Sequence, residues 1–92
     1  MSRCLKLLES AQTAPNNFRF DDLCKLAECY GWVYRRQRGS HVIYENMALS
    51  VEAGRVMNFQ DKQGKAKPYQ VKELLAAITL VENTEGENDD EI

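Results

Sequence analysis

The sequence contains no apolar run as long as the roughly 18 to 20 residues that a membrane-spanning helix requires. Residues 1–6 also lack the apolar stretch and the small-residue cleavage site of a secretory signal. A chain of 92 residues forms one small domain, which leaves little room for the deep cleft of a large cofactor. We therefore predict a soluble cytoplasmic protein with no membrane contact and no small-molecule cofactor.

The patterns of a metal site and of a nucleotide-binding loop are also missing. The sequence has an odd number of cysteines, namely Cys4, Cys24 and Cys29. No two of them are separated by two residues, which is the spacing of a metal knuckle. The sequence has one histidine, His41, which is not spaced to complete a zinc site. We expect reduced, partly buried thiols and no metal. The pattern GxxxxGK[ST] does not occur, which excludes a phosphate-binding P-loop.

Charge is unevenly distributed along the chain. The net charge of the whole sequence is only −2, but residues 82–92 hold six acidic and no basic side chains. Residues 31–67 hold seven basic and three acidic side chains. A basic middle segment can attract a polyanion, and the acidic tail would compete with that polyanion for the basic surface. An ordinary solvated surface with a solubilising tail explains the same charges.

The spacing of apolar residues predicts three helices. The first is short and covers residues 2–12. The second has Asp21 as its N-cap, repeats apolar side chains at i, i+3, i+4 and i+7, and ends at Gly31. The third begins at Pro68, shows the same repeat and ends at about residue 82, beyond which the chain has almost no apolar content.

Between the second and third helices the apolar pattern is that of strands. Aromatic and β-branched residues predict strands over residues 32–37, 41–45 and 55–60. Residues 46–54 either extend a hairpin or form a loop, and residues 61–67 read as a loop. The predicted fold is an α+β two-layer sandwich, in which helices cover one face of a three-stranded antiparallel sheet and leave the other face free.

This reading divides the chain into three parts. Residues 1–15 are an N-terminal helix with its linker, residues 16–82 are the folded domain, and residues 83–92 are an acidic disordered tail. Trp32, Tyr34 and Tyr44 could stack on nucleic-acid bases, but core packing explains them better.

His41 is the strongest candidate in this sequence for a chemical function. It begins a strand directly after the Gly39–Ser40 turn and lies near several arginines in sequence. An imidazole exchanges protons at cellular pH, and arginines bind phosphate. On RNA, the ring could take the proton of a 2′-hydroxyl or protonate the departing 5′-oxygen, with a cyclic phosphate as product and no metal required. An ordinary surface histidine is the alternative.

The lysines before the third helix form a second candidate region. Lys65 and Lys67 flank the helix N-terminus, where backbone N–H groups favour anions. Two solvated loop lysines explain the same residues. We predict RNA contacts at Arg36, Arg38, Lys65 and Lys67, with Gly39 and Ser40 shaping the turn that presents His41 and the Ser40 hydroxyl facing phosphate.

These motifs together resemble the HicA toxins of bacterial type II toxin–antitoxin systems, also called the YcfA-like family. The resemblance covers about two thirds of the chain and rests on four segments, in order, at residues 18–26 (FRFDDLCKL), 30–32 (YGW), 36–44 (RQRGSHVIY) and 64–75 (GKAKPYQVKELL). The triplet Gly-Ser-His alone is a weak signal. Its combination with the last segment, in a chain of this size, is specific.

The resemblance implies a fold similar to the double-stranded-RNA-binding domain, with an additional N-terminal helix here. It also implies cleavage of messenger RNA with His41 as the catalytic residue, and a HicB-type antitoxin as the protein partner. Two alternatives stay open, because RNA-binding domains of this shape bind without cutting. The chain could be a non-cleaving RNA-binding module, or an antitoxin-binding protein without nuclease activity.

Overall fold

The computed structural model describes residues 2–90, and the side chains of residues 2–83. Its elements, in chain order, are α1 (Arg3–Thr13), η1 (Pro15–Asn17), α2 (Phe20–Cys29), β1 (Val33–Arg38), β2 (His41–Glu45), β3 (Val56–Lys62), β4 (Lys65–Ala66) and α3 (Pro68–Asp90). The strands form one antiparallel sheet in the order β1-β2-β3-β4.

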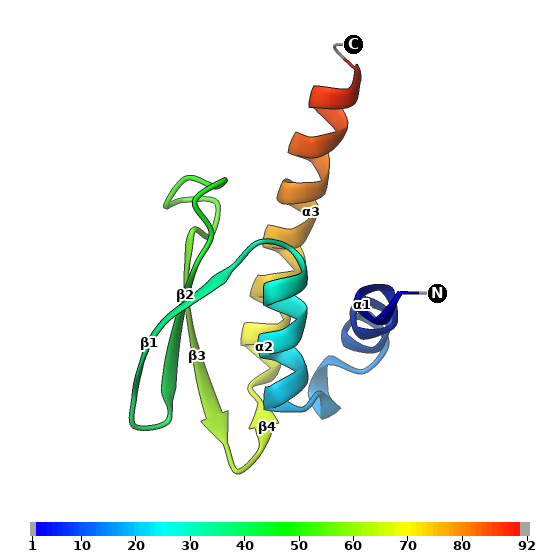
Figure 1. Cartoon of the computed structure of the whole chain (residues 1–92). Helices are drawn as coiled ribbons and strands as arrows, with labels where there is room; N and C mark the ends of the chain where they lie inside the picture. The colour runs from blue at the N-terminus through cyan, green and yellow to red at the C-terminus, as the bar shows by residue number, and fades with distance from the viewer. Residues whose placement is uncertain (1, 91–92) are drawn as a thin grey trace.

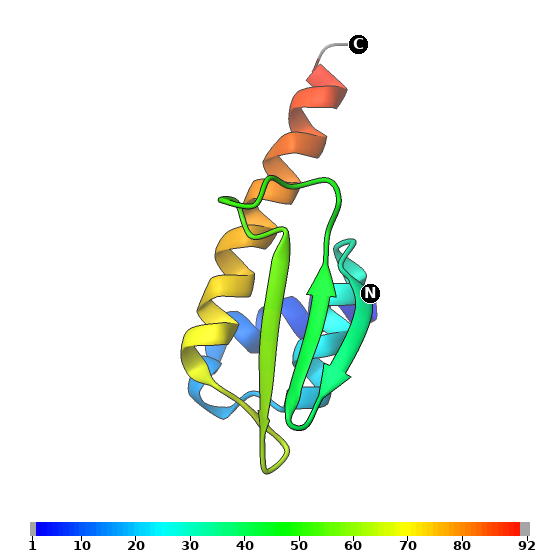
Figure 2. The same ribbon diagram turned by 90° about the vertical axis from the view of Figure 1, so that its left-hand side faces the viewer.

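The molecule has a sheet on one side and helices on the other. α2 and α3 cover one face of the sheet, and α1 lies against α2 and α3 on the side away from the strands (Figure 1). Within residues 2–90, no helix covers the opposite face, which is turned towards the viewer in Figure 2. The predicted α+β sandwich with an open sheet face is therefore confirmed, but the sheet has four strands instead of three.

The fourth strand arises in the segment that we predicted to be a loop. β3 continues to Lys62, and the chain reverses so that Lys62 pairs with Lys65 and Asp61 with Ala66. Gln63 and Gly64 form the turn with φ values of 55° and 85°. Two successive residues with positive φ match the right-handed twist of a hairpin, but a glutamine rarely adopts this conformation. This turn therefore has no clear signal in the amino-acid sequence.

Two helix boundaries also differ from the predictions. α2 begins at Phe20, and its N-cap is Arg19, whose side chain makes no capping hydrogen bond. Asp21 is not the cap but lies in the first turn, where its charge is favourable to the helix dipole. α3 continues to Asp90, which corrects the predicted end at residue 82. The side chains of the acidic tail beyond residue 83, and the competition predicted for them, lie outside the described part.

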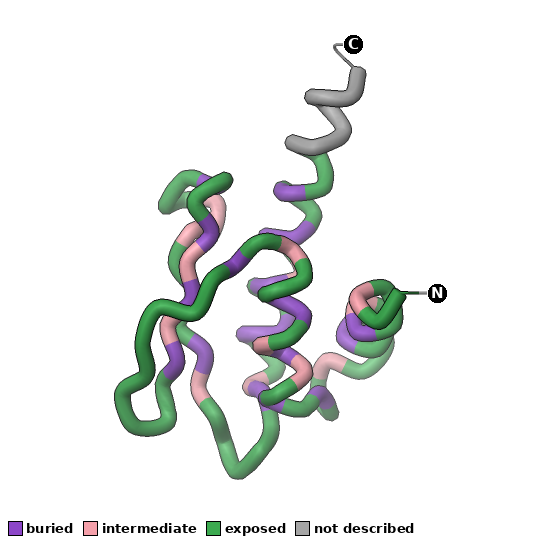
Figure 3. Tube along the Cα trace, viewed as in Figure 1, coloured by how far each residue is buried: buried purple, intermediate pink, exposed green. Residues whose placement is uncertain are grey.

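The hydrophobic core fills the space between the helices and the covered face of the sheet (Figure 3). Trp32, which is 1% exposed, donates a hydrogen bond from Nε1 to the carbonyl of Gly54 at 3.1 Å. Trp32 and Tyr44 are buried, as core packing predicted, whereas Tyr34 is half exposed and forms a T-shaped contact with the Tyr44 ring. The largest fully buried side chains are Trp32, Phe59, Leu23, Leu26, Leu74, Ile78 and Val71.

The cysteines contradict the prediction of three free thiols. Cys4 of α1 and Cys29 of α2 form a disulfide, although 25 positions separate them in sequence. The two helices pack against each other and bring the sulfurs together, a proximity that the spacing of cysteines does not reveal. Cys24 is free and partly buried, as expected, and burial raises the pKa of its thiol to about 11.

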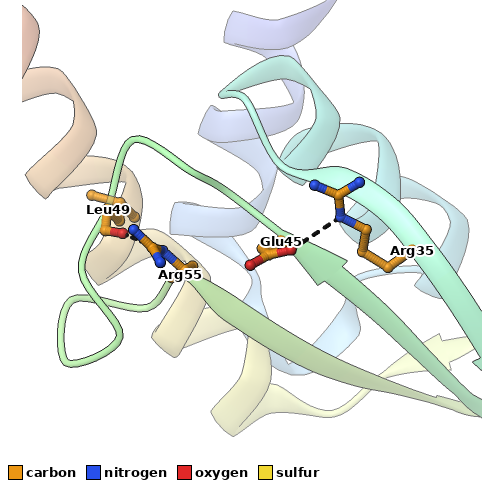
Figure 4. Close-up of polar contacts among 4 residues, drawn as sticks. All are labelled: Arg35, Glu45, Leu49 and Arg55. Atoms are coloured by element: carbon orange, nitrogen blue, oxygen red, sulfur yellow. Dashed lines mark hydrogen bonds and ion pairs between the residues drawn. The ribbon is translucent and has the colours of Figure 1, made fainter.

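Residues 46–54 form a loop with turns between β2 and β3. Asn46 is buried and anchors the loop, since its side-chain amide donates to the carbonyl of Tyr30 at 3.0 Å. Arg55 closes the loop by donating from Nε to the carbonyl of Leu49 at 2.7 Å (Figure 4). Within residues 2–90, no helix combines the length and the apolar character needed to cross a membrane.

Candidate active site on the open face of the sheet

The strand β2 divides its side chains between the two faces of the sheet. Val42 and Tyr44 are buried under the helices, whereas His41 is exposed and Ile43 is partly so. Successive side chains of a strand point to opposite faces, so His41 and Ile43 lie on the open face. The structure thus places the imidazole of His41 in contact with solvent, as the proposed chemistry requires.

A β-bulge in β1 brings two arginines to the same face as His41. Tyr34 pairs with the inward-facing Tyr44, and strict alternation would turn Arg36 and Arg38 inward as well. The register shifts between Tyr34 and Arg36, so that Arg36 pairs with Ile43 and Arg38 with His41. Paired residues share a face, and the extra residue of the bulge therefore directs both arginines to the open side.

His41 and its neighbours line a shallow hollow of about 420 Å³. Its other lining residues are Arg36, Gln37, Arg38, Ile43 and Asn58. Arg36 and Arg38 were predicted from the sequence as RNA-binding residues, whereas Asn58 was not. The alternation of polar Asn58 with the buried Met57 and Phe59 in β3 is the signal that could have found it, because this alternation places Asn58 on the open face.

Asn58 forms a hydrogen bond with the ring of His41. The distance between Nδ1 of His41 and Oδ1 of Asn58 is 2.9 Å. A carboxamide oxygen only accepts hydrogen bonds, so this contact favours the form of the ring that carries its hydrogen on Nδ1. In the neutral ring, Nε2 then has the free electron pair and can accept a proton.

The turn before His41 is built by Gly39 and Ser40. Gly39 adopts a φ of 60° and nothing lies within 4 Å of the position its Cβ would occupy, so backbone conformation and not crowding favours glycine here. The carbonyl of Ser40 accepts a hydrogen bond from the N–H of Asp61 at 2.8 Å, which fixes the turn against β3. His41 therefore projects from an anchored turn.

The predicted lysines lie in a different hollow from His41. Lys65 and Lys67 line a depression of about 440 Å³ together with Lys62 and Tyr69. The amine of Lys67 lies 5.9 Å from the centre of the Tyr69 ring. The turns that carry the two hollows lie at the same end of the sheet (Figure 2), where the Ser40–Asp61 hydrogen bond links them.

The positive charge beside His41 is only partly neutralised. Arg35 donates from Nε to Oε1 of Glu45 at 3.1 Å and forms an exposed ion pair (Figure 4). Within residues 2–83, Arg36 and Arg38 form no ion pair with a carboxylate. These two arginines are therefore available to an anion in the hollow.

Tyr44 is not available as an acid that could protonate the departing 5′-oxygen. Its hydroxyl donates to Oε2 of Glu28 at 2.8 Å on the helix side of the sheet. Burial, and then the hydrogen bond with Glu28, raise the pKa of Tyr44 above its usual range. Among the described residues, no three His, Cys, Asp or Glu side chains are grouped so that they could hold a metal ion.

The fold and the site define a small α+β domain that presents one histidine beside two arginines on the uncovered face of its sheet. A family model described as the HicA toxin of bacterial toxin–antitoxin systems matches residues 20–80, which is more than half of the chain. The chain belongs to the HicA toxin family, and this membership implies a cognate antitoxin as its partner. The match includes the site and leaves α1 outside. No curated protein and no solved structure shows a significant match.

Proposed function

We propose that this protein is an endoribonuclease toxin that binds messenger RNA and cleaves it by acid–base catalysis at His41, without a metal ion. The observation that carries the proposal is the geometry of the ring. Nδ1 is bound to Asn58, which leaves Nε2 as the basic nitrogen on an exposed face. Arg36 and Arg38 lie on the same face and have no carboxylate partner in the described part of the chain.

The reaction proceeds by attack of the RNA on itself. Nε2 of His41 takes the proton of a 2′-hydroxyl, and the 2′-oxygen forms a bond with the adjacent phosphorus while the bond from phosphorus to the 5′-oxygen breaks. The departing 5′-oxygen takes a proton from water, and the imidazolium returns its proton to the hydroxide that remains. The products are a 2′,3′-cyclic phosphate and a 5′-hydroxyl. Arg36 and Arg38 stabilise the negative charge that develops on the phosphate oxygens.

The second hollow extends the RNA-binding surface. Lys65 and Lys67 lie at the same end of the sheet as the Gly39–Ser40 turn, so neighbouring phosphates of one strand can reach both places. The Ser40 hydroxyl faces the phosphate group at which His41 catalyses cleavage. Contacts with phosphates position an RNA without selecting its sequence, so these residues provide affinity.

A HicB-type antitoxin neutralises the toxin by covering the open face. Val33 and Val56 are 53% and 52% exposed and flank Glu45 in the row of paired residues farthest from His41. Met47 and Val51 of the adjacent loop are exposed as well. Exposed apolar side chains grouped at one end of a face are typical of a protein-binding surface. A protein bound there would extend over the hollow and exclude RNA.

The test compares the wild type with the variant His41→Ala on a synthetic RNA in the presence of a chelator. We expect the wild type to produce cyclic-phosphate ends and the variant to lose about 10²- to 10⁴-fold in rate while it still binds the RNA. The variant Arg35→Ala is the control, because Glu45 already neutralises that arginine.

Each alternative function has its own outcome in this test. An RNA that is bound but never cleaved by the wild type identifies a non-cleaving RNA-binding module. Tight binding of the antitoxin without binding or cleavage of RNA identifies an antitoxin-binding protein. Cleavage by His41→Ala at the wild-type rate rules out His41 as the catalyst.

A further inference from the structure

The side chain of Asn58 is the one polar partner that the structure gives to the ring of His41 among the described residues. We propose that Asn58 is a positioning residue, which holds the imidazole in the form with hydrogen on Nδ1 and keeps Nε2 free on the open face. The catalytic part of this inference rests on the proposed function of His41. The structural part concerns the ring alone and is measured without RNA.

The contact is diagonal across two strands. In the register of the sheet, His41 pairs with Gln60, and Asn58 pairs with Ile43. The ring of His41 nevertheless reaches Oδ1 of Asn58 at 2.9 Å. The imidazole therefore leans along the sheet towards Ile43 and Arg36, into the hollow that these residues line. Without this hydrogen bond, the ring would be free to rotate towards solvent.

Asn58 is itself held from the other layer of the molecule. The side-chain amide of Gln70, in α3, donates to the carbonyl of Asn58 at 2.8 Å and accepts from the N–H of Gln60 at 2.9 Å. β4 pairs only with Asp61 and Lys62, so the stretch of β3 from Asn58 to Gln60 has no strand on the side away from β2. Gln70, which is 5% exposed, takes the place of the missing strand.

Gln70, Asn58 and His41 are connected by hydrogen bonds that run from the helix layer to the open face. Gln70 fixes the backbone of Asn58, and the side chain of Asn58 fixes the ring of His41. A buried primary amide with both of its functions satisfied is a rigid support. The series gives an exposed histidine, which would otherwise be mobile, a defined orientation.

The choice of tautomer decides whether His41 can act as a base. An imidazole in water carries its hydrogen mainly on Nε2, and in that form the outward nitrogen cannot accept a proton. An acceptor at Nδ1 reverses the preference, as the oriented base of a catalytic triad illustrates. Asn58 supplies this acceptor without a negative charge, so it does not attract the imidazolium as a carboxylate would.

The direct test measures the ¹⁵N chemical shifts of the His41 ring in the full chain, at a pH where the ring is neutral. We expect hydrogen on Nδ1 in the wild type and mainly on Nε2 in Asn58→Ala. Asn58→Asp should restore the Nδ1 form, because a carboxylate also accepts the hydrogen bond. Hydrogen on Nε2 in the wild type, or shifts that do not change in Asn58→Ala, would overturn the proposal.

The kinetic test follows the same variants on RNA. Asn58→Ala should lower kcat about tenfold, which is the effect of one net hydrogen bond, with little change in KM because the residue carries no charge. Asn58→Asp should recover activity with its pH–rate profile moved to higher pH, since the carboxylate stabilises the imidazolium. Gln60→Ala is the control, because Gln60 pairs with His41 but its side chain does not bond to the ring.

The two tests separate this inference from the proposed function. If the ring shifts respond to Asn58→Ala but the wild type does not cleave RNA, positioning stands and the nuclease proposal fails. If cleavage depends on His41 but Asn58→Ala changes neither the ring nor kcat, the nuclease proposal stands and positioning fails.

Discussion

Two ionisable side chains of β2, Tyr44 and His41, lie in opposite environments on the two faces of the sheet. Tyr44 points to the helices, where burial and Glu28 occupy its hydroxyl and raise its pKa. His41, three positions away, points to solvent, and one of its ring nitrogens has no partner among the side chains that the structure describes. The comparison shows that the face, more than the residue type, decides which group is available for chemistry. The covered face provides stability, and the open face is left for binding.

The largest expected effect on stability is the difference between substitutions at two adjacent residues of β3. Phe59→Ala removes a ring that is 1% exposed and leaves a cavity, so we expect the free energy of unfolding to fall by about 3–5 kcal/mol. Asn58→Ala, one position away on the open face, should change it by less than about 0.5 kcal/mol. Urea unfolding measures both, and equal losses would contradict the division between the faces.

Gln70 joins the two layers, and its removal should have an intermediate effect. Gln70→Ala leaves the carbonyl of Asn58 and the N–H of Gln60 without their partner, which should cost about 1–3 kcal/mol in the free energy of unfolding. Gln37→Ala, an exposed glutamine on β1, is the matched control and should be nearly neutral. Thermal unfolding tests the pair, and a neutral Gln70→Ala would remove the support that we assign to Asn58.

The arginines of β1 should differ in their contribution to RNA affinity. Arg36→Ala and Arg38→Ala should each lower the slope of log K against log salt by about 0.7, the value for one contact with a single strand. Arg35→Ala should change it less, because Glu45 holds that guanidinium. Fluorescence anisotropy over a salt series measures the slopes. A larger effect for Arg35 would show that RNA follows a different path over the face.

The stability of the protein should fall at alkaline pH because the thiol of Cys24, in α2, is partly buried. Burial raises the pKa of Cys24 from 9.0 to about 11, so the folded state keeps a proton that the unfolded chain releases. The resulting stability is complete below pH 9 and is lost as the pH rises towards 11. Cys24→Ala should therefore flatten the fall in melting temperature over this range, whereas His41→Ala should not.

Patterns local in sequence predicted much of the fold. The aromatic and β-branched residues at positions 41–45 predicted β2 at its observed bounds, and Gly39 marked the turn before it. The apolar stripe of α3 also predicted its buried face. The helix start at Phe20, the continuation of α3 and the hairpin at Gln63 were missed. Each depends on a weak capping or turn preference that tertiary contacts override.

The candidate site was predictable by residue type but not by arrangement. His41, Arg36 and Arg38 do share a face, but the bulge that brings them together is visible only in the register of the strands. Lys65 and Lys67 occupy a separate hollow. Asn58 lies far from His41 in sequence, and the Cys4–Cys29 disulfide depends on how α1 packs. Contacts of this kind follow from the assembled fold.

One pair of variants tests the central claim most directly, because it changes adjacent residues of β2 that face opposite ways. RNA cleavage per folded molecule is measured in a chelator for His41→Ala and Val42→Ala, together with the melting temperature of each. We predict that His41→Ala keeps its melting temperature and loses cleavage, whereas Val42→Ala melts lower and keeps cleavage. An active His41→Ala protein would contradict the account.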